Sequence, residues 1–269
     1  MPPVVVRRNL RETFDDLGAR GQIGLIPFLP AGFPDLDTTI ACLGALQSAG
    51  ASAIEIGIPF SDPIADGPVI QEAFTAALAR KIKVADVFAA IATARSSLAT
   101  PILAMVSFSI VFRYGIERFA ADARAAGFDG LILPDLPPPE ARNVCTQVGA
   151  ASLDTVLLVA PSTSPQRKRE IVQLCSGFVY YLSVSGITGE REQLPPDLAP
   201  NVRELKTLSD RPVCVGFGIH TARHVAQLRG IADGAIVGTA YVRRLREHLA
   251  DSSARRGQAV ADYTRELLG

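Results

Sequence analysis

An acidic residue interrupts one of the most apolar segments of the chain. Glu55 lies in the run Ile54-Glu55-Ile56-Gly57-Ile58, and burying a carboxylate in such a strand is costly unless it is paired or protonated. Side-chain alternation along a strand places Glu55 on the face opposite Ile54 and Ile56. A carboxyl group in that position has a raised pKa and suits proton transfer. The alternative is a structural carboxylate paired with an interior arginine, although none of the expected strands supplies an obvious one.

A second carboxylate, Asp66, follows Glu55 by eleven residues, in a segment rich in proline and glycine. Two carboxylates in different surroundings can hold different protonation states and therefore divide the roles of acid and base. The competing interpretation is that Asp66, like Asp62, only forms a turn, which is the commoner use of aspartate beside glycine or proline. The proximity of Glu55 favours the catalytic interpretation.

Glycines cluster near the ends of three expected strands, in Ser185–Gly189, Gly216–Gly218 and Gly238-Thr239. Barrel enzymes commonly bind phosphate at such ends through backbone N–H groups and a helix N-terminus. The Thr239 hydroxyl could add a further hydrogen bond. Each glycine taken singly is more typical of a turn, but together they predict a phosphate site and a phosphorylated small-molecule substrate.

Several other chemistries lack the residues that they need. No lysine falls at the carboxyl end of an expected strand, so a Schiff-base mechanism lacks its amine. His220 and His224 could share one helix face, but no third ligand clusters with them, which leaves zinc a minor alternative. Ser61 is not part of a GxSxG turn, which gives nucleophilic hydrolysis little support. The lysines are Lys81, Lys83, Lys168 and Lys206.

Eight short apolar runs alternate with stretches of helical spacing along the chain. Such runs, bounded by glycine, proline and aspartate, are typical of strands buried on both faces. The alternation predicts parallel βαβ units, and eight of them with no GxGxxG after the first favour a closed α/β (β/α)8 TIM barrel. We expect one domain over residues 1–269, with a short helix before the first strand and an extra C-terminal helix. The expected strands are Gly24–Phe28, Ala53–Ile58, Pro101–Val106, Gly130–Leu133, Thr155–Val159, Phe178–Ser183, Pro212–Gly216 and Ala235–Gly238. The expected helices include Asp37–Ala49, Val84–Ser97, Ile116–Ala126, Glu140–Val148, Gln166–Cys175 and Ala222–Arg229.

The composition narrows the class of protein. The 269 residues include 27 Lys+Arg and 27 Asp+Glu, giving a net charge of +0, and 48% are hydrophobic. These values are typical of a globular chain and argue against a nucleic-acid or anionic-membrane binder. The longest apolar run, Pro101–Phe112, is shorter than the roughly 18 to 20 residues that span a bilayer. Cysteines without CxxC spacing, and a start unlike a signal peptide, predict a cytoplasmic protein. The cysteines are Cys42, Cys145, Cys175 and Cys214.

These motifs, in this order, resemble the α-subunit family of tryptophan synthase. The most specific stretch is residues 54–71, IEIGIPFSDPIADGPVIQ, which is similar to the family signature around two catalytic carboxylates. The resemblance extends from about Glu12 to about Arg243. Further matching segments are Pro27-Phe28 with Ala31-Gly32, Pro134–Pro137, Phe178–Tyr181, Ser185–Gly189, Gly216–Gly218 and Gly238.

The resemblance implies a lyase that cleaves indole-3-glycerol phosphate to indole and glyceraldehyde 3-phosphate by a retro-aldol route. Glu55 would deliver a proton to indole C3 and remove one from the glycerol hydroxyl. Asp66 would hold the indole N–H, and Thr188 would close over the site and hydrogen-bond to Asp66. Phe28 and Tyr180 would line the substrate pocket. The implied phosphate ligands are Gly189, Gly218, Gly238 and Thr239.

No metal or organic cofactor is implied, because pyridoxal phosphate belongs to the partner β subunit of the family's α2β2 complex. The chain departs from the family pattern after the third strand, where Ser107 and Ser109 replace a usual Tyr and Asn, and Ile110 replaces the usual Pro that follows them. That segment is a loop facing the β subunit in the family. Further departures are Pro30, Phe33 and His220, the last in place of a serine expected to cap the helix after strand seven.

The intact carboxylates and the altered segment lead to the hypothesis that lyase chemistry is retained while coupling to a β subunit is weakened. A stand-alone lyase supplying indole to another pathway would fit the same pattern. Two alternatives remain open: a related phosphate-binding barrel enzyme, and a non-catalytic activator of a β subunit. The presence of both Glu55 and Asp66 argues against an activator.

Overall fold

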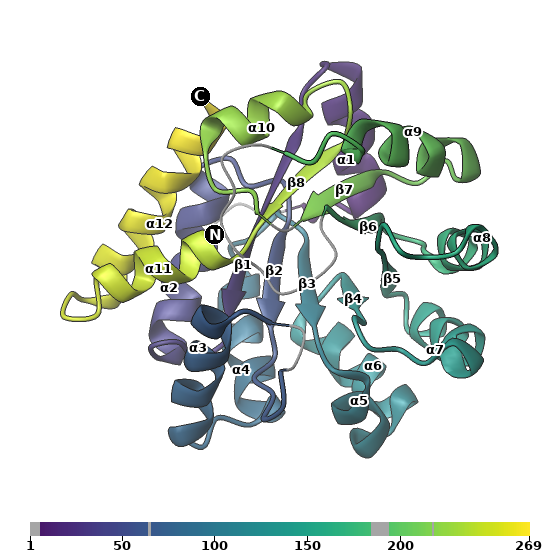
Figure 1. Cartoon of the computed structure of the whole chain (residues 1–269). Coiled ribbons are helices and arrows are strands. Elements are labelled where there is room, and N and C mark those ends of the chain that lie inside the picture. Colours follow the sequence, from purple (N-terminus) through teal and green to yellow (C-terminus); the bar gives the residue numbers. More distant parts are fainter. Residues whose placement is uncertain (1–5, 64–65, 184–193, 217) are drawn as a thin grey trace.

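The parallel barrel predicted from the alternation is confirmed. The structure, a computed structural model, describes residues 6–63, 66–183, 194–216 and 218–269. Over these residues eight parallel strands pair in chain order, and β8 pairs with β1 to close the barrel (Figure 1). The strands are β1 (Gly24–Pro30), β2 (Ile54–Gly57), β3 (Ile102–Met105), β4 (Gly130–Ile132), β5 (Asp154–Val159), β6 (Val179–Leu182), β7 (Val213–Gly216) and β8 (Gly234–Val237).

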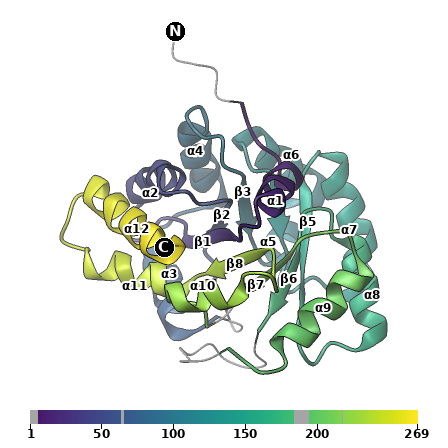
Figure 2. The same cartoon turned by 90° about the horizontal axis from the view of Figure 1, so that it is seen from above.

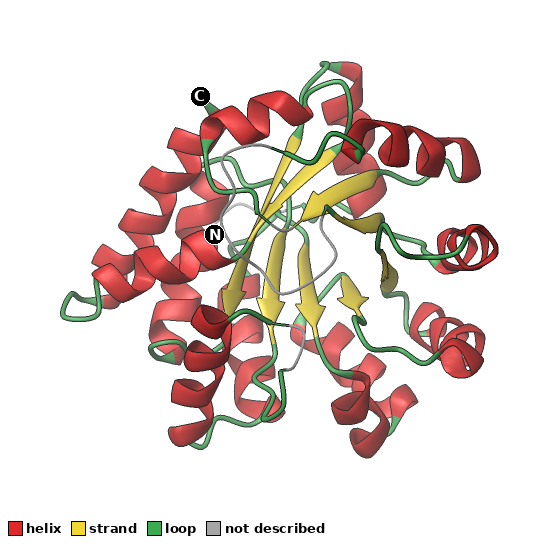
Figure 3. Cartoon of the chain, in the orientation of Figure 1, coloured by secondary structure: helices red, strands yellow, loops and turns green. Residues whose placement is uncertain are grey.

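Helices surround the strands. Helix α12 lies against α2 on the outside of the barrel, as Figure 2 shows, and Figure 3 shows the helices ringing the sheet. No helix in the described part of the chain is long and apolar enough to cross a membrane. The helices are α1 (Leu10–Ala19), α2 (Leu36–Ser48), α3 (Pro68–Ala79), α4 (Val84–Arg95), α5 (Phe108–Tyr114), α6 (Ile116–Ala126), α7 (Pro138–Ala150), α8 (Pro165–Leu174), α9 (Leu198–Leu208), α10 (Ala222–Leu228), α11 (Thr239–Glu247) and α12 (Ser253–Leu268).

Alternation along the strands divides the buried side chains into two cores. Ile54 and Ile56 point outward into the large core between the barrel and its helices. Leu103 and Ile132 point inward into a smaller core that fills the lumen. Phe14 of α1 packs edge-on against Phe178, with ring centroids 6.1 Å apart, and joins this inner core. The helix before β1 therefore contributes to filling the barrel interior.

The expected strands and helices are present, with ends that differ by one to a few residues, but the segment after β3 differs in kind. The expectation of a loop at Ser107–Ile110 is wrong, because α5 begins at Phe108 with Ser107 as its N-cap. The Asp135 carboxylate accepts the Phe108 N–H at 2.7 Å and the Ser107 hydroxyl at 2.6 Å. This carboxylate, which follows β4, satisfies backbone groups at the start of the helix.

The interpretation of His220 as the residue in the cap position of the following helix is also wrong. The N-cap of α10 is Thr221, whose hydroxyl accepts the His224 N–H at 3.2 Å. The helix therefore keeps a normal hydroxyl cap, and His220 does not have that role.

A buried ion pair ties together the amino-terminal ends of β3 and β4. The Arg95 guanidinium donates to the Asp129 carboxylate at 2.8 Å and to the Thr100 carbonyl at 2.7 Å. Asp129 also accepts the Ile102 N–H at 2.9 Å. Arg124 lies 3.6 Å from the other oxygen of Asp129 and is itself half-exposed.

We predict that Arg95→Ala lowers the free energy of unfolding by about 3 kcal/mol, the lower end for a broken buried pair, because Arg124 remains beside Asp129. Urea unfolding of the whole chain measures the change. The matched control is Arg20→Ala, which breaks an exposed 2.8 Å pair with Asp16 and should cost less than about 1 kcal/mol. Equal losses in the two variants would contradict the prediction.

Candidate active site

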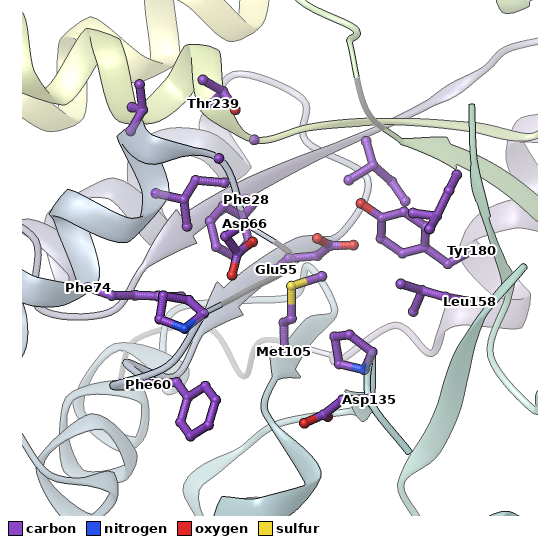
Figure 4. Close-up of a pocket in the computed structure, with 18 of the residues that line it drawn as sticks. Phe28, Glu55, Phe60, Asp66, Phe74, Met105, Asp135, Leu158, Tyr180 and Thr239 are labelled. Atoms are coloured by element: carbon purple, nitrogen blue, oxygen red, sulfur yellow. The ribbon is translucent and has the colours of Figure 1, made fainter. Parts of the chain in front are cut away.

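One cavity of about 960 Å³ gathers the described residues that the sequence singles out. It opens where the carboxyl ends of the strands meet, the usual position of active sites in such barrels. Figure 4 shows side chains from several strands pointing into it. Thr188 and Gly189 lie outside the described residues. The predicted site residues that line the cavity are Phe28, Glu55, Asp66, Tyr180, Gly218, Gly238 and Thr239.

Glu55 is held in the middle of β2. Its backbone is in register with Phe28 of β1 and Leu103 of β3, so strands on both sides fix its position. The residue is fully buried, and neither carboxyl oxygen has a hydrogen-bond partner among the residues that the structure describes. Burial therefore raises the pKa of Glu55 well above its usual value. No interior arginine among the described residues pairs with Glu55. The alternative that Glu55 is a structural carboxylate in a buried ion pair therefore loses its support.

Asp66 approaches the same cavity from the loop before α3. Its N–H donates to the Pro63 carbonyl at 3.1 Å, as expected for a turn. The Gln71 side-chain amide donates to the Asp66 carbonyl at 2.8 Å and to the Pro63 carbonyl at 3.2 Å. The carboxylate nevertheless points into the cavity near Glu55 (Figure 4), so Asp66 is more than a turn former. Burial raises the pKa of Asp66 to about 6.

The two carboxyl groups thus lie in different electrostatic surroundings. Burial favours the protonated form of Glu55, because the lumen offers its charge no compensation among the described residues. Asp66 is mostly ionised at a pH above 6. One cavity therefore contains two carboxyl groups whose pKa values are shifted to different extents, an arrangement that can divide the roles of acid and base.

Tyr180 closes one side of the cavity from β6. Its ring lies where a Cβ on Gly216 would be, with only 2.5 Å to the hydroxyl, so residue 216 must be glycine. Gly216 therefore makes room for Tyr180, and it does not line the cavity as a phosphate-binding glycine would. Burial, and then the charges of Glu55 and Asp66, raise the pKa of Tyr180 well above its usual value. The hydroxyl stays protonated.

The loops after β7 and β8 form another end of the cavity, marked by Thr239 in Figure 4. Gly218 has φ +80°, a conformation that favours glycine. Gly238 is the N-cap of α11, which begins at Thr239. A helix N-terminus beside a glycine turn carries free N–H groups and positive potential, and it suits an anion.

The remaining walls include residues that sequence reasoning missed. Strand periodicity could have indicated Met105 and Leu158, since each continues the inward face of its strand. His220 and Arg243 also line the cavity, and no local signal marks them as site residues. The missed apolar lining residues include Phe60, Ile70, Phe74, Met105 and Leu158.

Comparison with known proteins agrees with this geometry. A family model described as "Tryptophan synthase alpha chain" matches residues 14–267. The chain belongs to the tryptophan synthase α family. A tryptophan synthase alpha chain of Chloroflexus aggregans is 43% identical over 261 residues, covering 97% of each chain. One from Microcystis aeruginosa is 40% identical over 258 residues, covering 95% of this chain and 96% of that one.

Solved structures of the tryptophan synthase family have the same fold. A chain of the Mycobacterium tuberculosis tryptophan synthase in its aminoacrylate-bound form superposes with a TM-score of 0.84 at 37% identity, covering 96% of this chain and 97% of that chain. An α subunit from Pyrococcus furiosus superposes with a TM-score of 0.83 at 36% identity, covering 91% and 98%. The resemblance inferred from the motifs is confirmed over nearly the whole chain.

We predict that Glu55→Gln gains stability relative to the unmodified chain as the pH rises. Both states bind the Glu55 proton well below pH 4.5, but above it only the unfolded state ionises. The unmodified chain therefore loses up to about 1.4 kcal/mol per pH unit until the pH reaches the folded-state pKa. The glutamine variant has no proton to lose at this position, so its stability lacks that dependence on pH.

Urea unfolding of both proteins between pH 4.5 and pH 7.5, the range above the usual pKa of Glu55, measures this difference. The matched control is Glu140→Gln in the exposed first turn of α7. A stability difference that is independent of pH, or that grows equally in the control, would contradict the protonated state of Glu55.

Proposed function

We propose that this chain cleaves indole-3-glycerol phosphate to indole and D-glyceraldehyde 3-phosphate, the α reaction of tryptophan biosynthesis, in the cytoplasm. One observation carries the proposal. Glu55, a buried carboxyl without a described partner, shares a cavity with the more exposed Asp66 and with the glycine and helix-terminal groups after β7 and β8. Membership of the family supports the same assignment. The reaction needs no metal or organic cofactor.

In the proposed reaction Glu55 is the general acid and base. Its proton is transferred to C3 of the indole ring, which places a positive charge on the ring nitrogen. The resulting Glu55 carboxylate then takes the proton of the adjacent glycerol hydroxyl as the C–C bond breaks. The bond's electron pair returns to the ring, and the oxygen becomes the aldehyde of glyceraldehyde 3-phosphate. Glu55 is therefore protonated again at the end of the reaction.

Asp66 supplies the compensating negative charge. Its carboxylate would accept the indole N–H and stabilise the cation that forms after C3 protonation. The carboxylate is available because its pKa of about 6 leaves it mostly ionised at neutral pH. A fully buried carboxyl such as Glu55 suits this role less well, since burial favours its neutral form.

The remaining site residues would hold the substrate. Phe28 and Tyr180 line the cavity beside Glu55 and would contact the indole ring. Gly218, Gly238 and Thr239 would bind the phosphate. Gly189 as a phosphate ligand and Thr188 as a closing group over Asp66 stay predictions, because both lie outside the described residues.

We predict that Glu55→Gln lowers kcat for indole release by about 10²- to 10⁴-fold, the range of general acid–base catalysis, with little change in substrate binding. Asp66→Asn should lower kcat to a similar or smaller extent. Indole release from indole-3-glycerol phosphate by the purified chain is the assay, and Glu140→Gln is the matched control. An active Glu55→Gln variant, or an unmodified chain without activity, would overturn the proposed function.

A tryptophan synthase β subunit is the proposed partner, in an α2β2 complex with weakened coupling. The altered segment forms the N-cap and first turn of α5, where Ser107 and Ser109 hydrogen-bond to each other at 2.9 Å. Both also line the cavity. A change at these positions therefore affects the cavity and the helix that follows it. If the coupling to a β subunit were lost entirely, the chain would be a stand-alone lyase.

We predict that adding the cognate β subunit with serine stimulates indole turnover less in the unmodified chain than in a Ser107→Tyr/Ser109→Asn double variant, which restores the usual family residues. Turnover with and without β subunit, together with sedimentation of the mixture, measures the coupling. Tight association and strong mutual activation of the unmodified chain would contradict weakened coupling. Full activation of a β subunit by Glu55→Gln, without any lyase activity in the unmodified chain, would instead identify a non-catalytic activator.

A further inference from the structure

Two side chains with basic groups lie at the end of the cavity expected to hold phosphate. Arg243 and His220 line it together with Gly218, Gly238 and Thr239. Arg243 follows Thr239 by four residues in α11, so the two side chains share one face of that helix. His220 comes from the neighbouring strand end, just before α10. The two residues that line the cavity therefore come from segments that follow adjacent strands, β7 and β8.

The His220 ring is fixed by its surroundings. Its Nδ1 lies 2.8 Å from the Gly218 carbonyl, and its own carbonyl accepts the Tyr263 hydroxyl at 2.7 Å. Its ring packs edge-on against the buried His224 ring, with centroids 4.7 Å apart. With Nδ1 bonded to the backbone, Nε2 is the remaining polar atom of a ring that lines the cavity.

The other arginines of α11 are engaged away from the cavity. Arg244 pairs with Glu247 at 3.2 Å and covers the Tyr263 ring at 5.1 Å. Arg246 pairs with Glu72 at 2.8 Å. Neither lines the cavity, whereas Arg243 does. Arg244 is therefore a natural control for Arg243, with the same charge on the same helix.

We propose that Arg243 and His220 bind the substrate phosphate as side-chain ligands and thereby favour a phosphomonoester dianion. This inference rests on the proposed function, which places the substrate phosphate at this end of the cavity. Backbone N–H groups alone offer only partial positive charges to an anion. A guanidinium adds a full charge and a planar pair of donors that fits phosphate oxygens. An imidazole held at Nδ1 presents Nε2 to the cavity as a second polar atom for the phosphate.

The chemistry of the two ligands predicts how binding changes. Neither side chain reaches the reacting carbons if the phosphate is bound at this end, so both act on ground state and transition state alike. Their loss should raise KM and leave kcat nearly unchanged. Because Arg243 is exposed, its contribution to the affinity for phosphate should be moderate. That contribution should weaken as added salt screens the charge.

Calorimetric titration of the full chain with inorganic phosphate and with glycerol 3-phosphate tests the inference without turnover. Arg243→Gln should raise both dissociation constants about tenfold, as expected for one charge-assisted contact. Arg243→Lys should recover part of the affinity. His220→Asn, which keeps an N–H for Gly218 but lacks a second ring nitrogen, should weaken binding by a smaller factor. Arg244→Gln should change it less than about twofold.

The salt dependence separates a phosphate ligand from a structural residue. Binding by the unmodified chain should weaken with added NaCl more steeply than binding by Arg243→Gln, since one charge contact is already lost. Equal affinities of Arg243→Gln and Arg244→Gln, or no phosphate binding by the unmodified chain, would overturn the inference. If the unmodified chain cleaves indole-3-glycerol phosphate while Arg243→Gln binds phosphate normally, only this inference fails. If phosphate binding depends on Arg243 but no indole is released, the proposed function fails and the anion site stands.

Discussion

The burial of the Glu55 carboxyl in an apolar lumen is the constraint around which the site is built. A fully buried carboxyl that has no partner among the described residues is in surroundings that favour its neutral form. The inner core supplies that environment, with Leu103, Ile132 and Phe178 filling the lumen and Phe14 of α1 contributing from outside the barrel. The free-energy cost of an unpaired polar group inside the protein is offset by the much larger apolar core between strands and helices. The raised pKa of Glu55 is thus a consequence of how the barrel packs.

The second carboxyl, Asp66, needs a different position in the fold from that of Glu55. A group on a neighbouring strand would share the lumen with Glu55 and would also be neutral, which would leave no anion to stabilise a cation. Asp66 instead sits on a loop, where partial exposure keeps its pKa near 6. A loop lacks the precision of a strand, and the Gln71 amide compensates for this by bonding the Asp66 and Pro63 carbonyls from the following helix. The strand and the loop therefore give two carboxyls of similar intrinsic acidity different surroundings within one cavity, which shift their pKa values to different extents.

Much of the fold and of the chemistry could be predicted from local sequence, and the failures share a physical cause. Glu55 stands out because a single charged residue interrupts an apolar run, and the barrel follows from alternation. The helix at Phe108 was missed because the carboxylate that satisfies its first N–H is Asp135, which lies in the turn after a later strand, β4. Gly216 resembled a phosphate-binding glycine, but only the packed structure shows that the Tyr180 ring needs the space of its missing side chain. Thr221 rather than His220 caps α10, a one-residue difference that spacing cannot resolve. In each case the deciding contact joins residues that only closure of the barrel brings together, or depends on backbone geometry.

The topology also gives the cavity an electrostatic polarity that orients a charged substrate. Figure 4 shows Thr239 and Asp135 near opposite sides of the cavity, with Glu55 and Asp66 between them. The first side has the N-terminus of α11, whereas the other has the Asp135 carboxylate. Under the proposed function, a phosphate dianion would be attracted to the helix terminus and repelled from Asp135, so a molecule with a phosphate at one end and an aromatic ring at the other would enter in one direction. Because Asp66 and Glu55 lie between the two sides, that direction brings the bond next to the ring beside the carboxyls. The strand order β7-β8-β1-β2 fixes this arrangement, because the loops proposed to bind the phosphate follow β7 and β8 and the proposed proton donor is on β2.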